Sequence, residues 1–194
     1  MRLFFQLDNK SLDGKRQKIE NPQPGTTLMN TLPSAEAILY REKVFALMKS
    51  KSSALVSNGA PEHAAALFEC FFMNATRSVT IFCRNLSPAV FGRPEVIAAA
   101  VGAVSRDVKL DIVCQEEPVS PSKFRETVSK TSPNSIRVFP NLEDFKENFA
   151  IMDGCAFRYE DDSSKVNAVA SMNRPDLCAR LLTIFGHLTL QATV

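Results

Sequence analysis

Lysine, asparagine, aspartate and serine side chains lie close together in residues 146–173, which makes this segment the best candidate for chemistry. Lys146, Asn148 and Asp153 come first, and Ser171 and Asn173 follow a later apolar run. A lysine is mostly protonated at neutral pH unless it is buried, so Lys146 would be a poor nucleophile. The segment also has a purely structural interpretation. Its aspartate and the following glycine are typical of a hairpin turn, and the serine and second asparagine suit a strand end and a helix cap.

The same segment resembles the active-site motif of the phospholipase D-like superfamily. Members carry His-x-Lys, four residues, Asp and, after a strand, Gly-Ser-x-Asn. Here Lys146 stands at the His position, Asn148 at the Lys position and Asp153 at the Asp position, and residues 170–173 (Ala-Ser-Met-Asn) match the last part. The resemblance covers about residues 58–190 and is closest to small bacterial domains with eroded motifs. It implies an α/β domain with a mixed sheet flanked by helices.

The departures from the motif concern the reacting groups. In active members, the resemblance implies, one His attacks phosphorus and a second His, from another half or subunit, protonates the leaving group. Lys146 replaces the first His, and Asn148 cannot supply the lost cation. We therefore assign no catalytic residue and expect a non-catalytic domain. Any remaining activity would be that of a phosphodiesterase or nuclease with a rearranged site.

Several basic residues are candidates for binding phosphate or nucleic acid. Arg84 directly follows an expected strand, where open α/β sheets place ligands, and Arg174 precedes the last expected helix, whose N–H groups favour anions. Each also fits a solvated surface charge. Arg158 and Lys165 stand near acidic residues 160–162, which oppose nucleic-acid binding there. The full set of candidates is Arg84, Lys146, Arg174, Lys10, Lys15, Arg16 and Lys18.

Other kinds of chemistry find little support. There are two histidines, His63 and His187, and no Gly-rich phosphate loop or metalloprotease motif. The five cysteines form no CxxC pair and lie in apolar contexts, which favours buried thiols in a reducing compartment. We expect no metal site and no cofactor.

The composition is that of an ordinary globular protein. The hydrophobic fraction is 45%, the charged fraction 23% and the formal net charge +2, which weakens the case for a polybasic coat. The sequence has no apolar run long enough to span a membrane, and its start turns polar too soon for a secretory signal. A cytoplasmic location is expected.

Helices and strands are predicted to alternate from residue 58 onward. The expected helices are 61–73, 94–105, 121–130 and one after Arg174, and the expected strands are 78–83, 108–114, 136–139 and 166–171. Residues 149–152 and 156–159 flank the turn signal and form a late hairpin. Together they predict an α/β fold with a mixed sheet.

The first 57 residues are predicted to form an arm in front of a domain at 58–194. A short strand at residues 3–7, a polar linker to Pro33 and a helix at 35–50 capped by Ser34 would make up this arm. It packs either on its own domain or on a partner chain. The apolar candidates for docking a partner are Leu3, Phe5, Ile38, Phe45 and Met48.

Three functions remain open. The first is a scaffold or adaptor subunit of a bacterial multiprotein complex, in nucleic-acid processing or phage (antiviral) defence, bound through the arm to a larger protein subunit. The second is a nucleic-acid-binding module without chemistry, and the third is the rearranged phosphodiesterase. The sequence leaves a homodimer open, and no membrane partner is expected.

Overall fold

Seven strands form one mixed sheet in the computed structural model, which describes residues 34–118, 122–142, 144–162 and 167–191. Their order across the sheet is β1-β7-β6-β5-β2-β3-β4. In chain order the strands are β1 Val56–Asn58, β2 Ser78–Cys83, β3 Lys109–Cys114, β4 Ile136–Val138, β5 Asn148–Met152, β6 Ala156–Glu160 and β7 Ala168–Ser171.

The strand directions divide the sheet into a parallel and an antiparallel part. β2, β3 and β4 run parallel, whereas β5, β6, β7 and β1 pair antiparallel in succession, beginning on β2. We call the edge where β2, β3 and β4 end the carboxyl edge, and the edge where they begin the amino edge. The register places the starts of β5 and β7 and the ends of β1 and β6 at the carboxyl edge.

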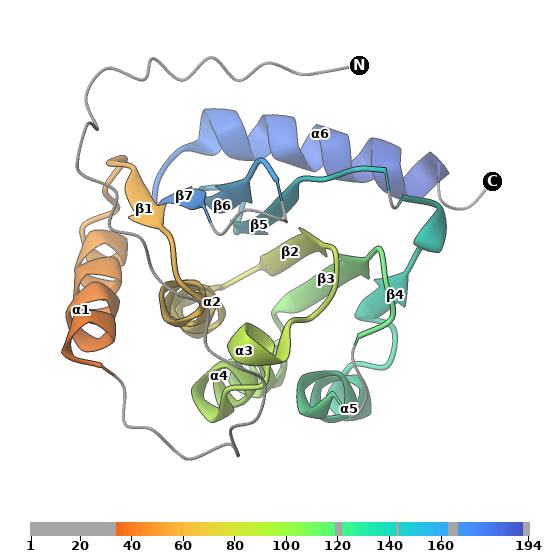
Figure 1. Cartoon of the computed structure of the whole chain (residues 1–194), viewed down its shortest axis with the longest axis horizontal. Helices are drawn as coiled ribbons and strands as arrows, with labels where there is room; N and C mark the ends of the chain where they lie inside the picture. Colours follow the sequence, from red (N-terminus) through yellow and green to blue (C-terminus); the bar gives the residue numbers. More distant parts are fainter. Residues whose placement is uncertain (1–33, 119–121, 143, 163–166, 192–194) are drawn as a thin grey trace, which may run out of the picture. The chain divides into compact units, whose positions relative to one another are not determined.

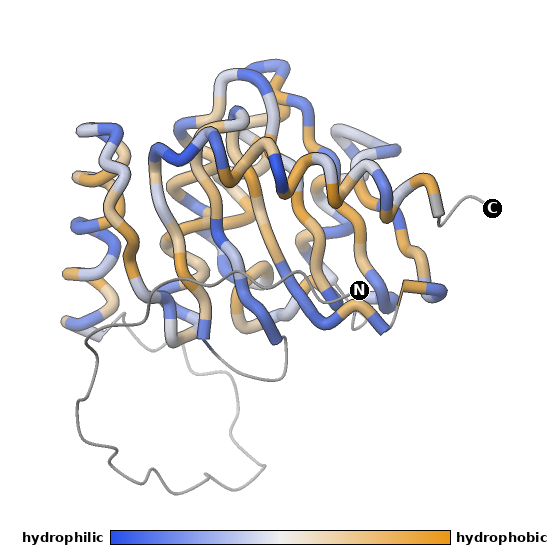
Figure 2. The backbone as a smooth tube through the Cα atoms, turned by 90° about the horizontal axis from the view of Figure 1, so that it is seen from above, coloured by the Kyte–Doolittle hydropathy of each residue, from blue (hydrophilic) through white to orange (hydrophobic). Residues whose placement is uncertain are grey.

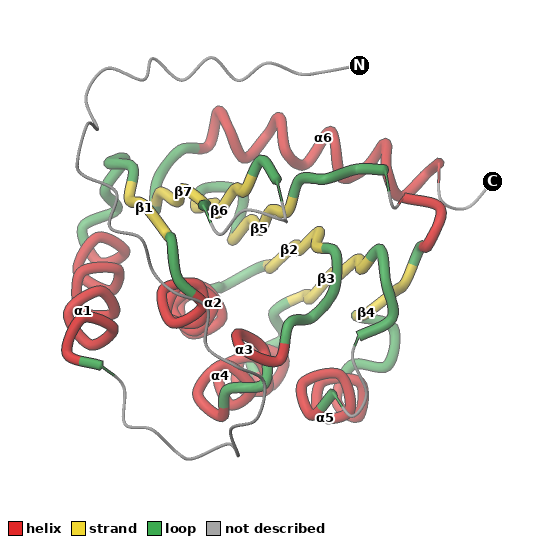
Figure 3. Tube along the Cα trace, in the orientation of Figure 1, coloured by secondary structure: helices red, strands yellow, loops and turns green. Residues whose placement is uncertain are grey.

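Helices cover both faces of the sheet (Figures 1 and 3). The last helix, α6, lies on one face, and α1 to α5 lie on the opposite face. Ser34 caps α1 by accepting a hydrogen bond from the Ala37 N–H, and prolines start α2 and α4, where a missing N–H costs nothing. The helices are α1 Ala35–Lys49, α2 Pro61–Asn74, α3 Pro88–Phe91, α4 Pro94–Ser105, α5 Lys123–Thr131, the 3-10 turn η1 Pro140–Leu142, and α6 Pro175–Gln191.

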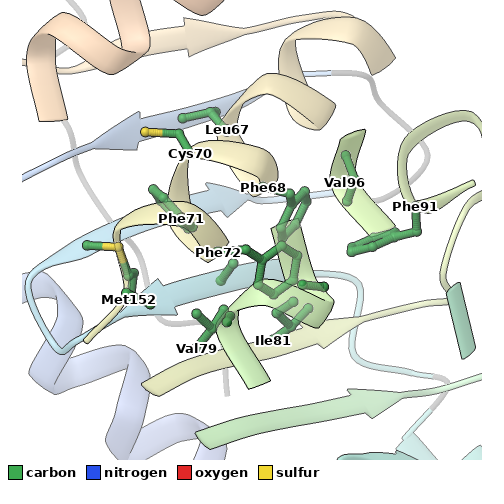
Figure 4. Packing of buried hydrophobic residues seen from close by; sticks show 14 of the residues in the cluster. Leu67, Phe68, Cys70, Phe71, Phe72, Val79, Ile81, Phe91, Val96 and Met152 are labelled. Atoms are coloured by element: carbon green, nitrogen blue, oxygen red, sulfur yellow. The ribbon is translucent and has the colours of Figure 1, made fainter. Parts of the chain in front are cut away.

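Phenylalanines fill much of the space between the sheet and α2–α5. The Phe91 ring centroid lies 4.6 Å from that of Phe68 and 5.1 Å from that of Phe124. Figure 4 shows Phe68, Phe72 and Phe91 above Val79 and Ile81 of β2. On the other face Phe149 stacks on Phe82 and meets Phe185 of α6. The backbone in Figure 2 is mostly hydrophobic in the middle of the strands and hydrophilic at their ends.

The predicted fold class is confirmed. The strand at 78–83 and the helix at 94–105 begin and end where the sequence predicted them. Helix α5 starts two residues later than expected, because the Ser122 hydroxyl accepts from the Arg125 N–H and acts as its cap. The prediction missed β1, α3 and η1, which are only three or four residues long and carry little periodicity.

Helix α1 packs on the chain itself. One compact unit spans Pro33–Val194, and the expected boundary at 57/58 falls inside β1, which pairs with β7. Arg41 of α1 forms two hydrogen bonds, at 2.6 and 2.7 Å, to the buried carboxylate of Glu69 on α2. A strand shared with the sheet and an ion pair to a buried carboxylate make α1 and β1 part of the domain.

This placement separates the partner-docking candidates by their exposure. Met48 is only 9% exposed and Phe45 packs against the core, so neither forms an open docking surface. Ile38 remains exposed at 47%, beside Leu39 at 66%. The candidates Leu3 and Phe5 lie outside the described residues, as do the predicted strand at 3–7 and the linker.

Candidate functional site

The structure separates the motif residues onto two edges of the sheet. Asn148 begins β5 at the carboxyl edge, with Lys146 just before it. Asp153 directly follows β5 and therefore lies at the amino edge, about 17 Å away at roughly 3.4 Å per residue. Ser171 pairs with Phe157 near the start of β6, so Ser171 and Asn173 also lie at the amino edge. The sequence had grouped these five residues into one candidate site, and the structure does not bring them together.

Asn148 is held in place through both ends of its amide. Its Oδ1 accepts a 2.8 Å hydrogen bond from the Arg84 N–H, and its Nδ2 donates at 2.9 Å to Oε2 of Glu160. Cys83 and Asn148 end and begin neighbouring antiparallel strands, so this amide joins the two strands past their last paired residues. Asn148 therefore serves as a bridge between β2, β5 and β6.

A buried ion pair fills the carboxyl edge beside Asn148. Arg158 and Glu160 are each 8% exposed, and two guanidinium nitrogens lie 3.4 Å from the two carboxylate oxygens. The Arg158 Nε donates at 3.1 Å to the side chain of Asn58, which is 1% exposed. Strand alternation explains the pairing, because residues 158 and 160 point to the same face.

Tyr40 of α1 and His63 of α2 extend this network outward. The Asn58 amide lies 3.4 Å from the Tyr40 hydroxyl, and the Tyr40 ring stacks on the His63 ring with centroids 3.9 Å apart. Burial raises the pKa of Tyr40, against the opposing effects of Asn58 and the Arg158 charge. The His63 Nε2 lies 3.9 Å from a carboxylate oxygen of Glu36. His63 thus packs on a tyrosine at the corner of α1 and α2.

The two arginine candidates are paired with acidic residues. Arg84 donates to Glu116 at 2.6 Å, and Arg174 holds both carboxylate oxygens of Asp176 at 2.9 and 3.0 Å. The Arg174 hydrogen bonds lower the pKa of Asp176 to about 2. Lys146 is exposed. Lys10, Lys15, Arg16, Lys18 and Lys165 lie outside the described residues.

Asp153 stabilises the turn between β5 and β6. Its carboxylate accepts hydrogen bonds of 2.8–2.9 Å from the N–H groups of Thr76, Arg77 and Ser78 and from the Thr76 hydroxyl. Partial burial alone would raise its pKa, but these donors hold the pKa of Asp153 below its usual value. Its own φ is 51°, in the left-handed region. The geometry agrees with the structural interpretation of this residue and not with proton transfer at the carboxyl edge.

Other reactive groups stay apart from this edge or are buried. Among the described residues no three His, Cys, Asp or Glu side chains gather as a metal site would require. Cys83 and Cys114 lie 3.9 Å apart, sulfur to sulfur, at the ends of β2 and β3. The hydrogen bond to Cys114 and burial raise the pKa of Cys83, which keeps it a thiol. No described helix is long and apolar enough to cross a membrane.

The sequence analysis named Arg158 only as a basic residue near acidic ones, and it gave no role to Glu160, Asn58 or Tyr40. One signal was available. Residues 156–160, Ala-Phe-Arg-Tyr-Glu, alternate within a strand, and every second position from Ala156 faces the core shared with α2. An Arg-x-Glu spacing on the buried face of a strand indicates a paired buried charge, because an unpaired one would be too costly.

Solved structures show what fold this is. The phospholipase D family member Nuc from Salmonella typhimurium superposes with a TM-score of 0.55 at 18% identity, over 69% of this chain and 92% of Nuc. The chain has a phospholipase D-like fold. TrmBL2, an archaeal chromatin protein described as showing a novel mode of DNA binding, superposes with a TM-score of 0.52 at 13% identity. That match covers 80% of this chain and 61% of TrmBL2. No protein-family model matches the sequence, and no curated protein matches it.

Proposed function

We propose that this chain is a non-catalytic member of the phospholipase D-like fold that works by binding. Its role would be that of a scaffold or adaptor subunit in a bacterial multiprotein complex, in nucleic-acid processing or phage defence. The observation that carries the proposal is the Arg158–Glu160 pair with Asn58 and Asn148. These side chains satisfy one another at the carboxyl edge, where the resemblance would place the reacting histidine.

Three features oppose phosphoryl transfer at this edge. Lys146 stands where the resemblance expects the nucleophile, and a protonated amine has no free lone pair to attack phosphorus. Asn148 carries no positive charge, and its Nδ2, the group that could donate to a phosphoryl oxygen, already donates to Glu160. The Glu160 carboxylate occupies the neighbouring position, and its negative charge would repel a phosphate.

A turnover assay tests the absence of catalysis. The full chain would be incubated with bis(p-nitrophenyl) phosphate and with labelled single- and double-stranded DNA, with and without a divalent cation. We expect no product above that of a Lys146→Ala variant, which changes an exposed side chain. Turnover that is lost in this variant, while its unfolding curve is unchanged, would establish the rearranged phosphodiesterase instead.

The adaptor role requires a surface for a partner. Ile38 and Leu39 are large apolar side chains exposed on α1, which fits a contact beyond the domain, together with Leu3 and Phe5 of the N-terminal segment. Full-length tagged protein would be purified from native cells beside an Ile38→Asp, Leu39→Asp variant. Leu182→Asp, Leu190→Asp on α6 is the matched control, since these residues are exposed to a similar degree.

We expect one larger protein to co-purify in constant ratio with the chain and the α6 variant, and to be lost from the α1 variant. If equal amounts of the partner were recovered with all three proteins, the contact would not lie on the exposed side chains of α1. A chain that elutes alone, as a monomer or a homodimer, would contradict the adaptor role.

The second candidate function is a nucleic-acid-binding module. The structural neighbour TrmBL2 is described as a DNA-binding chromatin protein, and this similarity favours the hypothesis. Its signature is an affinity for DNA that falls steeply with salt, because phosphate contacts release counterions. An affinity that does not change with salt would remove this candidate.

A further inference from the structure

Charged residues are distributed unequally between the two edges of the sheet. Among the described connecting segments and strand starts at the amino edge there are five basic and two acidic residues: Lys51, Arg77, Arg106, Lys109 and Arg174, with Asp107 and Asp153. Among the described connecting segments at the carboxyl edge, the three basic residues Arg84, Arg93 and Lys146 face six acidic ones: Glu116, Glu117, Asp144, Glu147, Asp161 and Asp162. The edge that the fold resemblance links with phosphate chemistry is therefore the acidic one.

The basic residues of the amino edge also differ in what they contact. The ammonium groups of Lys51 and Lys109 have no hydrogen-bond or ion-pair partner within the part of the chain that the structure describes, and both residues are exposed. The guanidinium of exposed Arg77 donates to a backbone carbonyl, that of Asp153. At the carboxyl edge Arg84 and Arg93 both bind carboxylates, and Lys146 is the one basic residue of the described connecting segments there without a side-chain hydrogen bond or ion pair. Charge that no acid neutralises is thus concentrated on the amino edge.

Contacts within the amino edge place these residues in one row. The Lys109 N–H donates to the Arg77 carbonyl at 2.9 Å, and the Arg174 N–H donates to the Cys155 carbonyl at 2.7 Å. The Ser171 hydroxyl contacts the Ser52 carbonyl, which joins the Lys51 turn to the end of β7. From β1 to β3 the row crosses five interstrand spacings, about 24 Å, or roughly seven base pairs of duplex DNA.

Two basic residues of the row have structural roles that explain their presence. Arg106 donates to the Phe72 and Met73 carbonyls at the end of α2, and Arg174 is paired with Asp176. Lys51 has no such role. It follows α1 with φ 50°, a position where glycine is favoured, and still carries a long charged side chain. A long charged side chain at a strained backbone position is a second, independent reason to look for a function of that side chain.

We propose that the amino edge of the sheet, through Lys51, Arg77 and Lys109, is the surface on which this domain contacts the phosphate backbone of nucleic acid. The contact lies on the edge opposite to the one where the motif resemblance would put it. This inference rests on the second candidate function. It does not depend on whether the carboxyl edge is catalytic.

Two charge-matched double variants of the full chain test the assignment. Lys51→Gln, Lys109→Gln removes two charges from the amino edge, and Lys123→Gln, Lys146→Gln removes two exposed charges from the carboxyl side. Binding to a fluorescein-labelled duplex of about 20 base pairs would be followed by anisotropy between about 50 and 300 mM salt. Unfolding curves would show that both variants keep the stability of the wild type.

We expect the amino-edge variant to bind more weakly and its log–log salt slope to fall by about two, since each lost phosphate contact removes about 0.9. The carboxyl-side variant should keep the wild-type slope and bind at least as tightly. If the wild type binds and the carboxyl-side variant loses as much as the other, or neither changes, the inference is wrong while the second candidate function stands. If the wild type does not bind, both fail.

Discussion

Arg158 and Glu160 stand two residues apart on β6, and each guanidinium NH2 group lies 3.4 Å from a different carboxylate oxygen. Both side chains are almost completely buried at the edge of the sheet where α/β folds bind ligands. Asn58 and Asn148 complete their hydrogen bonds from β1 and β5. The pair therefore joins the β5–β6 hairpin to β1, which lies 100 residues earlier in the chain, and the polar groups needed for a ligand are already satisfied by the protein.

Breaking this pair should be far more costly than removing it. Glu160→Ala leaves the Arg158 charge buried without its partner, and we expect the free energy of unfolding to fall by about 3–5 kcal/mol. The double variant Arg158→Met, Glu160→Leu removes both charges. Its loss of unfolding free energy should be clearly smaller than the sum of the losses in Arg158→Met alone and in Glu160→Leu alone. Urea unfolding of the single and double variants measures the coupling between the two sites. Additive losses would show that the two side chains do not depend on each other.

The sequence predicted the elements well and the site poorly, for physical reasons that these residues show. Strand 78–83 has buried residues in succession, and helix 94–105 starts at a proline, so each carries its own local signal. The site depends on register. The sequence alone did not show that Asn148 and Glu160 pair across one hairpin, whereas Ser171 pairs with Phe157 at the other end. A motif defined by spacing was therefore divided between two edges.

The helix of the predicted N-terminal arm is a second case in which the sequence predicted an element but not its contacts. The apolar positions of residues 35–49 predict a helix but do not say what covers it. Glu69, a buried acid in the middle of α2, accepts both of its described side-chain hydrogen bonds from Arg41 of α1. This contact joins positions 28 residues apart, which no local pattern reveals.

Asp153 should make the protein sensitive to acid. Its pKa in the folded state is below the usual value, so its contribution to stability is present above the pKa of the unfolded chain, about 3.9. This contribution is lost as the pH falls through the folded-state pKa. Asp153→Asn keeps the shape but weakens the acceptor for three backbone N–H groups and a hydroxyl. We expect a loss of about 1–3 kcal/mol at pH 7.

Urea unfolding at pH 7 and at about pH 3 separates this effect from general destabilisation. The difference between wild type and Asp153→Asn should shrink at the lower pH, because the wild-type carboxyl then begins to protonate. Asp161→Asn is a suitable control, since it makes the same chemical change at an exposed residue. A difference that stays constant with pH would contradict the role given to the Asp153 charge.

The cysteines should differ sharply in reactivity. Burial raises the pKa of Cys70 and of Cys178 to about 12, and Cys83 and Cys114 are also buried, whereas Cys155 is partly exposed. Because the thiolate is the reacting form, we expect one fast thiol in the native protein and five after unfolding. Titration with a chromogenic disulfide at pH 8 measures the number of fast-reacting thiols in the native and in the unfolded protein. Cys155→Ser should remove the fast phase, and a second fast thiol in that variant would contradict the packing of the core.

Lys51 offers a test in which stability and binding should move in opposite directions. It occupies the position after the end of α1, where Lys51 N–H donates to the Met48 carbonyl and Ser52 N–H to the Leu47 carbonyl. This arrangement needs a left-handed residue, and Lys51 adopts it at φ 50° against the clash of its own Cβ. Lys51→Gly should stabilise the fold by about 1 kcal/mol and raise Tm by roughly 2–4 °C.

Lys51→Ala is the control, because it removes the charge but keeps the Cβ. It should leave Tm near the wild-type value, and both variants should weaken DNA binding to the same degree. If glycine and alanine gave the same Tm, the backbone at residue 51 would not be strained. If only one of them weakened binding, the effect would come from the backbone and not from the lost ammonium. A glycine variant that is more stable and binds DNA less tightly would show that the Lys51 side chain contributes to binding at a cost in stability.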